Sequence, residues 1–94
     1  MVVLRIEHPV PDYEGWKKAF DSDPVGRQKS GVLRYQVLRP VEDPKYVMID
    51  LEFATKAQAE ALLAALRGVW GRVQGQTMTD PKARIVEALE TKTF

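Results

Sequence analysis

The feature that most constrains this chain is the order in which strand-like and helix-like apolar patterns follow one another. In the strand-like stretches, apolar and polar residues alternate with a period of two or β-branched residues are dense. In the helix-like stretches, apolar residues return every three or four positions, so that they form one stripe. The expected strands are residues 2–8, 32–39, 46–53 and 83–91, and the expected helices are residues 12–21 and 55–70.

This order, β-α-β-β-α-β, is the ferredoxin-like pattern of an α+β fold. Right-handed connections then place both helices on one face of a four-stranded antiparallel sheet, with the strands in the order 4-1-3-2. The chain has 94 residues, so we expect a single domain over residues 1–94. The apolar residues that share the covered face or the helix stripes form the predicted core: Leu4, Ile6, Trp16, Phe20, Val47, Ile49, Leu51, Leu62, Leu63 and Leu66.

Local capping signals mark where the helices begin. Asp12 stands where the carboxylate of a helix N-cap can accept a free backbone N–H. Thr55 and Gln58 have the spacing of a capping box, in which each side chain satisfies the other residue's backbone N–H. The pair Asp23-Pro24 resembles a second N-cap and first helical residue, and it predicts a short additional turn of helix.

Charge and composition exclude several classes of function. The chain has 14 basic and 13 acidic residues, a formal net charge of +1, so it lacks the basic excess of a nucleic-acid-binding protein. It has no cysteine, which excludes disulfides and thiolate chemistry and fits the cytoplasm. The most apolar stretch, residues 57–73, carries four charged or amide side chains, and the N-terminus has no signal-peptide pattern, so no membrane association is expected.

The second face of the predicted sheet is rich in charged residues of both signs. Arg5 and Arg34 are the expected partners of Asp50 and Glu52, although two carboxylates at i and i+2 are also a minimal metal or acid–base pair. The face is either solvated or stacked on a second copy, in which case its charges must pair. Its expected members are Val3, Arg5, Glu7, Arg34, Gln36, Met48, Asp50, Glu52, Arg84 and Glu90.

Four segments carry a resemblance to a known superfamily. They are residues 12–20 (DYEGWKKAF), 31–39 (GVLRYQVLR), 43–53 (DPKYVMIDLEF) and 59–63 (AEALL). With the order of the elements, they resemble the dimeric α/β-barrel superfamily, which includes antibiotic biosynthesis monooxygenase-like proteins. The resemblance implies a homodimer whose two sheets stack into a shared barrel, with ligands bound between sheet and helices.

The same resemblance bears on activity. Some monooxygenase members work without metal or cofactor and use an Asn, a Trp and a Tyr, whereas heme-degrading members use an Asn, a Trp and a His. This chain contains no asparagine, so neither pattern carries over whole. The helix tryptophan of the family is best matched by Trp70.

The candidate site residues follow from face parity and from this resemblance. His8, the only histidine, shares the inner face of the first strand and is a candidate general base or heme ligand; the competing interpretation is a hydrogen-bonded strand end. Trp70 is the second catalytic candidate, with core packing as its alternative. The predicted wall of a pocket for an aromatic or polycyclic ligand is Tyr13, Trp16, Phe20, Tyr35 and Met78.

Two classes of function remain open at this point. The first is a small-molecule-handling, monooxygenase-like protein that uses no cofactor or metal. The second is a non-enzymatic ligand-binding or structural dimer module. A cavity that reaches His8 and Trp70 favours the first, and a filled core around them favours the second.

Overall fold

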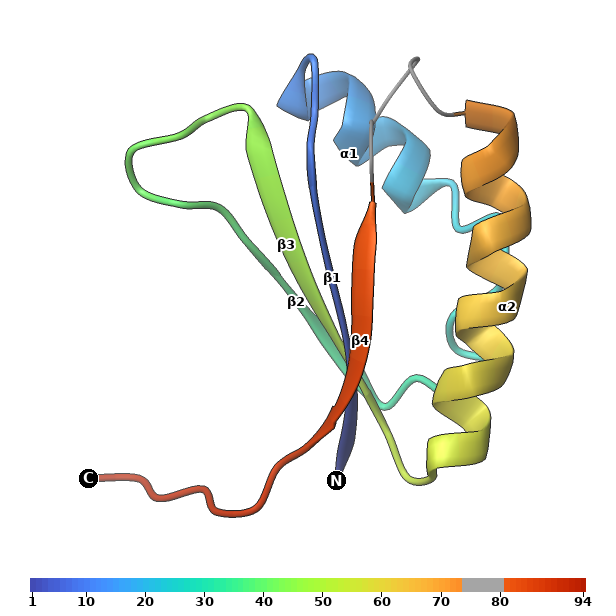
Figure 1. The fold of residues 1–94 in the computed structure, drawn as a ribbon, viewed down its shortest axis with the longest axis vertical. Coiled ribbons are helices and arrows are strands. Elements are labelled where there is room, and N and C mark those ends of the chain that lie inside the picture. Colours follow the sequence, from blue (N-terminus) through green and yellow to red (C-terminus); the bar gives the residue numbers. More distant parts are fainter. Residues whose placement is uncertain (74–80) are drawn as a thin grey trace.

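The structure is a computed structural model that describes residues 1–73 and 81–94. Along the chain the elements are β1 (Val2–Pro9), α1 (Tyr13–Asp21), β2 (Arg34–Leu38), β3 (Tyr46–Phe53), α2 (Lys56–Val73) and β4 (Lys82–Glu87). All neighbouring strands are antiparallel, in the order β2-β3-β1-β4. Figure 1 shows α1 and α2 on the same side of the sheet. The predicted fold class and strand order are confirmed.

Both helices begin at the caps that the sequence predicts. The carboxylate of Asp12 accepts a hydrogen bond of 3.0 Å from the backbone N–H of Gly15. At α2, Thr55 and Gln58 exchange two hydrogen bonds of 3.3 Å between side chain and backbone. Such reciprocal bonds satisfy N–H groups that have no partner within the helix, which fixes where it starts.

The last strand is shorter than the pattern predicts and ends at Glu87 rather than at residue 91. Its pairing with β1 reaches Val2 opposite Glu87, and one further backbone bond of 3.0 Å joins the N–H of Ala88 to the carbonyl of Met1. The observed pairing of β4 with β1 ends there. Glu90 therefore lies beyond the sheet and is not part of its outer face, contrary to the prediction.

The connection from α1 to β2 also differs from the prediction, because residues 22–33 form turns and no helix. Asp23 adopts a left-handed backbone with φ of 51°, unlike the extended conformation of an N-cap. Its carboxylate accepts from the N–H of Arg27 at 2.9 Å and so holds the turn. The strand β2 begins two residues late, at Arg34, and α2 continues three residues past the expected end.

The core lies between the inner face of β1 and β3 and the two helices. Seven of the ten predicted core residues are buried, and Phe53, Val10 and Ala59 join them. Phe20, Leu63 and Leu66 are only half-buried, and Phe20 and Leu66 line a cavity between the two helices. The buried seven are Leu4, Ile6, Trp16, Val47, Ile49, Leu51 and Leu62.

The outer face of the sheet carries charge pairs formed within the chain. Arg5 donates two hydrogen bonds of 2.9 Å to the two carboxylate oxygens of Asp50, directly opposite it in the register. The Nε of Arg34 donates to one carboxylate oxygen of Glu52, its register partner on β3, as predicted. The charges of these four residues are therefore compensated within the chain. Neither helix that the structure describes is long and apolar enough to cross a membrane.

Candidate functional site

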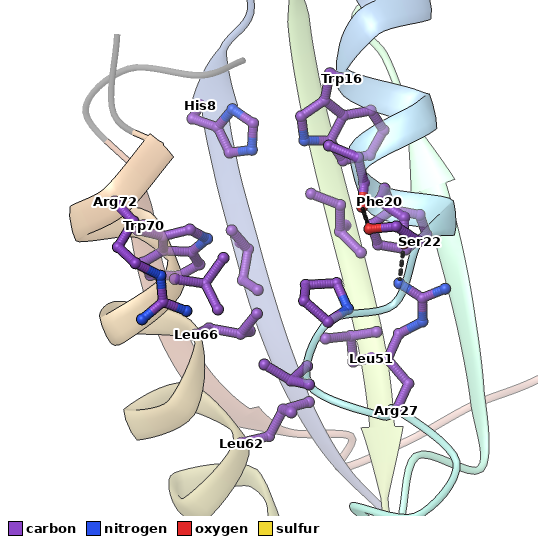
Figure 2. Close-up of a pocket in the computed structure, with 16 residues that line it drawn as sticks. His8, Trp16, Phe20, Ser22, Arg27, Leu51, Leu62, Leu66, Trp70 and Arg72 are labelled. Carbon is purple, nitrogen blue, oxygen red and sulfur yellow. Dashed lines mark hydrogen bonds between the residues drawn. The ribbon is translucent and has the colours of Figure 1, made fainter. Parts of the chain in front are cut away.

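A cavity of about 320 Å³ separates the two helices above the inner face of the sheet. Figure 2 shows its two walls, α1 with the following turns on one side and α2 on the other. The floor consists of Ile6, His8, Ile49 and Leu51; the α1 wall of Trp16, Ala19, Phe20, Ser22, Pro24, Val25 and Arg27; and the α2 wall of Leu62, Leu66, Val69, Trp70 and Arg72. Phe20 and Leu66 are only half-buried, and their side chains line this cavity.

His8 brings the polar atoms of its imidazole to the cavity floor. Strand parity places it on the inner face with Leu4 and Ile6, and its side chain is 1% exposed. Its Nδ1 lies 3.0 Å from the carbonyl oxygen of Pro9. A carbonyl only accepts hydrogen bonds, so in the neutral imidazole the proton is on Nδ1 and Nε2 carries a lone pair. Within the residues that the structure describes, Nε2 has no hydrogen-bond partner.

The surroundings of His8 favour its neutral form. Burial lowers the pKa of the imidazole below its ordinary value of 6.5, and the hydrogen bond to Pro9 offsets only part of this shift. The ring also meets the indole of Trp16 edge-on, at a centroid distance of 5.9 Å. His8 is therefore ready, at neutral pH, to accept a proton or a hydrogen bond.

The buried neutral imidazole predicts a specific dependence of stability on pH. Because the pKa of His8 is below 6.5 in the folded chain, the unfolded chain binds more protons just below pH 6.5. The contribution of neutral His8 to the free energy of unfolding is therefore complete above pH 6.5. It is lost as the pH falls toward the pKa of the folded chain, by up to about 1.4 kcal/mol per pH unit. Urea unfolding between about pH 5 and 7.5 measures this slope, which the variant His8→Gln should lose. Equal slopes in both proteins would contradict the assignment.

A row of aromatic side chains forms the α1 wall. Trp16 and Phe20 are stacked with centroids 5.0 Å apart and planes 25° apart. Tyr13 packs on Trp16 at 5.9 Å, and Tyr35 meets Phe20 edge-on at 5.2 Å. Of the predicted pocket residues, Trp16 and Phe20 line the cavity, whereas Tyr13 and Tyr35 support these two from outside the lining. Trp70 lies across the cavity on α2 (Figure 2).

Sequence reasoning missed two arginines, Arg27 and Arg72, which line the same cavity. Arg27 lies in the segment for which the sequence predicts a short helix. The left-handed backbone of Asp23 forms a turn there instead, and this turn sets the position of Arg27. Arg72 lies beyond the expected end of the second helix, and its spacing of three residues from Val69, which also lines the cavity, could have placed it near the same side. The remaining candidate, Met78, falls outside the described residues.

The chemistry of the lining is otherwise apolar. Among the described lining residues the one hydroxyl is that of Ser22, which donates to the carbonyl of Ala19 at 2.6 Å. No group of three or more metal-ligating side chains lies together in residues 1–73 and 81–94. The carboxylates of Asp50 and Glu52 are on the opposite face of the sheet, where they form ion pairs with Arg5 and Arg34. The site is thus an aromatic-walled cavity with one neutral imidazole.

Comparisons with known proteins place the fold among solved structures. The sequence matches no protein-family model and no curated protein. Structures described as antibiotic biosynthesis monooxygenases share the fold, so the resemblance in the sequence is confirmed at the level of fold.

Three further solved structures are similar over nearly the whole chain. The cofactor-independent oxygenase SnoaB from Streptomyces nogalater has a TM-score of 0.74 at 12% identity, covering 96% of this chain and 94% of its own. The heme-degrader MhuD from Mycobacterium tuberculosis, with two hemes bound in its active site, has a TM-score of 0.69 at 20% identity, covering 97% and 99%. A dimeric ferredoxin-like protein from an uncultured marine organism has a TM-score of 0.65 at 14% identity, covering 97% of each chain.

Proposed function

We propose that this chain binds a flat aromatic ligand in the cavity between its helices, and that a hydroxyl group of the ligand donates a hydrogen bond to Nε2 of His8. The observation that carries the proposal is an acceptor nitrogen that has no partner among the described residues, on the largely apolar floor of the cavity. An acceptor that loses water without gaining a donor is costly, so a ligand that fills the cavity and supplies the donor gains affinity. The stacked faces of Trp16 and Phe20 favour a planar partner.

The size of the cavity limits the size of this ligand. A dry protein cavity of about 150 Å³ accepts one benzene ring. The cavity of about 320 Å³ therefore suits two fused rings, and its open side between the helices leaves room for larger polycyclic systems to protrude.

The reaction that this arrangement supports is oxygenation of an electron-rich hydroxyarene without a cofactor. Neutral His8 takes the hydroxyl proton at Nε2, and the phenolate that remains donates electrons to dioxygen, which is the oxidant. One oxygen atom of dioxygen replaces a ring hydrogen to give a quinone, and the other leaves as water with the two hydrogens that the substrate loses. Trp16 and Trp70 hold the ring from opposite sides. The fold shared with a cofactor-independent oxygenase supports this reaction.

The second candidate function is binding without catalysis. It is favoured by the absence of asparagine from the chain, since the cofactor-free members of the superfamily use that residue. Oxygen consumption in the presence of a bound hydroxyarene, with formation of a quinone, separates the two functions.

Calorimetric titration with 2-naphthol tests the binding proposal. We expect wild-type protein to bind 2-naphthol and the variant His8→Phe to bind it about five- to tenfold more weakly, which is the worth of one hydrogen bond in a protein site. Naphthalene has no hydroxyl, so both proteins should bind it equally. If wild-type protein binds neither compound, the proposal is contradicted. Heme binding can be compared in a separate titration that follows the absorption spectrum of heme.

We also propose that two copies stack through the outer faces of their sheets. The pairs Arg5–Asp50 and Arg34–Glu52 support this, because charges that are already paired lose less on leaving water. Val3 and Met48 share the face and are half-exposed in the single chain. The fold shared with a dimeric ferredoxin-like protein supports the same assembly. A specific interface of this kind buries at least about 1,000 Å² in total.

A further inference from the structure

We propose that Arg72 recognises an anionic group, so that the ligand of the cavity is a hydroxylated aromatic carboxylate. This inference rests on the proposed binding of a hydroxyarene. It adds to the hydrogen bond at neutral His8 a second contact, which is between opposite charges. The hydroxyl group meets His8 on the floor of the cavity, and the carboxylate meets Arg72 at its rim.

The charge of the lining is one-sided. Of the described residues that line the cavity, two are arginines and none is an aspartate or a glutamate. With His8 neutral, the titratable groups around a bound ligand therefore add up to a positive charge. A lining of this charge favours an anionic group on the ligand.

Arg27 is already engaged by its own segment of the chain. Its Nη1 donates to the carbonyl of Phe20 at 2.8 Å, and its Nε lies 3.5 Å from the carboxylate of Asp23. The guanidinium also stacks on the ring of Phe20, at 3.9 Å from its centroid. These contacts hold Arg27 in place and compensate its charge, so it contributes to the wall more than to anion binding.

Arg72 is different, because it lines the cavity from the last turn of α2 and remains exposed. No ion pair to Arg72 exists within residues 1–73 and 81–94. Figure 2 shows it on the same wall as Trp70, across the cavity from Arg27. A guanidinium that has no ion pair among the described residues, beside an indole that holds the ring, is suited to a carboxylate, which it can bind with two parallel hydrogen bonds.

The test compares two probes that differ only in the carboxylate. Both 6-hydroxy-2-naphthoate and 2-naphthol have two fused rings and one hydroxyl, and only the first carries a carboxylate, at the end remote from that hydroxyl. We expect wild-type protein to bind 6-hydroxy-2-naphthoate more tightly than 2-naphthol. The variant Arg72→Gln should lose about tenfold in affinity for the carboxylate probe, as for one charge-assisted hydrogen-bonded pair, and nothing for 2-naphthol.

Arg67→Gln is the matched control. Arg67 lies on the same helix, is exposed and does not line the cavity, so this variant removes the same charge without touching the site. It should bind both probes as the wild type does. An equal loss in the two arginine variants would reduce the effect to net charge, and unchanged binding of the carboxylate probe by Arg72→Gln would overturn the inference. If wild-type protein binds 2-naphthol with no advantage for the carboxylate, the inference fails alone; if it binds neither probe, the proposed function fails with it.

Discussion

Replacing Phe53 with alanine is expected to lower the free energy of unfolding by about 3–5 kcal/mol. Phe53 ends β3, is 0% exposed and belongs to the hydrophobic core cluster. Removal of its ring loses the transfer free energy of a buried aromatic group and leaves a cavity that the surrounding strands cannot close. A domain of 94 residues has a total stability of only about 5–14 kcal/mol. The variant should therefore unfold at a much lower urea concentration.

The variant Phe94→Ala is the control for this experiment. It makes the same substitution at the C-terminal residue, whose side chain is fully exposed and lies outside every element. Its free energy of unfolding should stay within about 0.5 kcal/mol of the wild type. A loss at Phe53 below about 1 kcal/mol would mean that the inner face of β3 is assigned wrongly.

The variant Asp50→Lys is expected to convert the proposed dimer into a monomer. It replaces a carboxylate that accepts two hydrogen bonds from Arg5 with a second cation, so that like charges face each other in the middle of the outer sheet face. Burying these unpaired charges between two sheets costs several kcal/mol. The mass by sedimentation should fall from twice 10.7 kDa to 10.7 kDa.

Glu60→Lys provides the same change of charge on α2, away from the outer face. Glu60 forms only an exposed pair with Lys56 at 3.4 Å, which contributes little to stability. This variant should keep the dimer mass. A wild-type mass of 10.7 kDa at micromolar concentration would contradict the dimer itself, and a dimer that survives Asp50→Lys would place the contact on another surface.

The sequence predicted the structure best where the period of the apolar pattern or a local hydrogen bond decides it. Successive side chains of a strand point to opposite faces of the sheet, so the apolar alternation placed Ile6 and His8 together on the inner face. The spacing of Thr55 and Gln58 predicted the start of α2 because both bonds of a capping box lie within four residues. The partners of Asp50 and Glu52 followed from the same parity.

Features that depend on distant parts of the chain were beyond such reasoning. The end of β4 at Glu87 coincides with the end of its pairing with β1, a long-range contact that no pattern within 83–91 records. The backbone of Asp23 is left-handed, so a residue typical of N-caps holds a turn instead. His8 could be placed on the correct face, but the cavity beside it exists because α1 and α2 stand apart, and that distance is a tertiary property.

The central claim is that the cavity holds an aromatic ligand whose hydroxyl donates to His8. The most direct test is the ¹⁵N resonance of the His8 imidazole during titration with 2-naphthol, because the chain has a single histidine and its ring signals need no further assignment. Before addition, the two nitrogens should report a neutral ring protonated at Nδ1. At saturation, the signal of Nε2 should move as it accepts a hydrogen bond, while that of Nδ1 stays near its starting value. An Nε2 signal that does not change while 2-naphthol binds would contradict the claim.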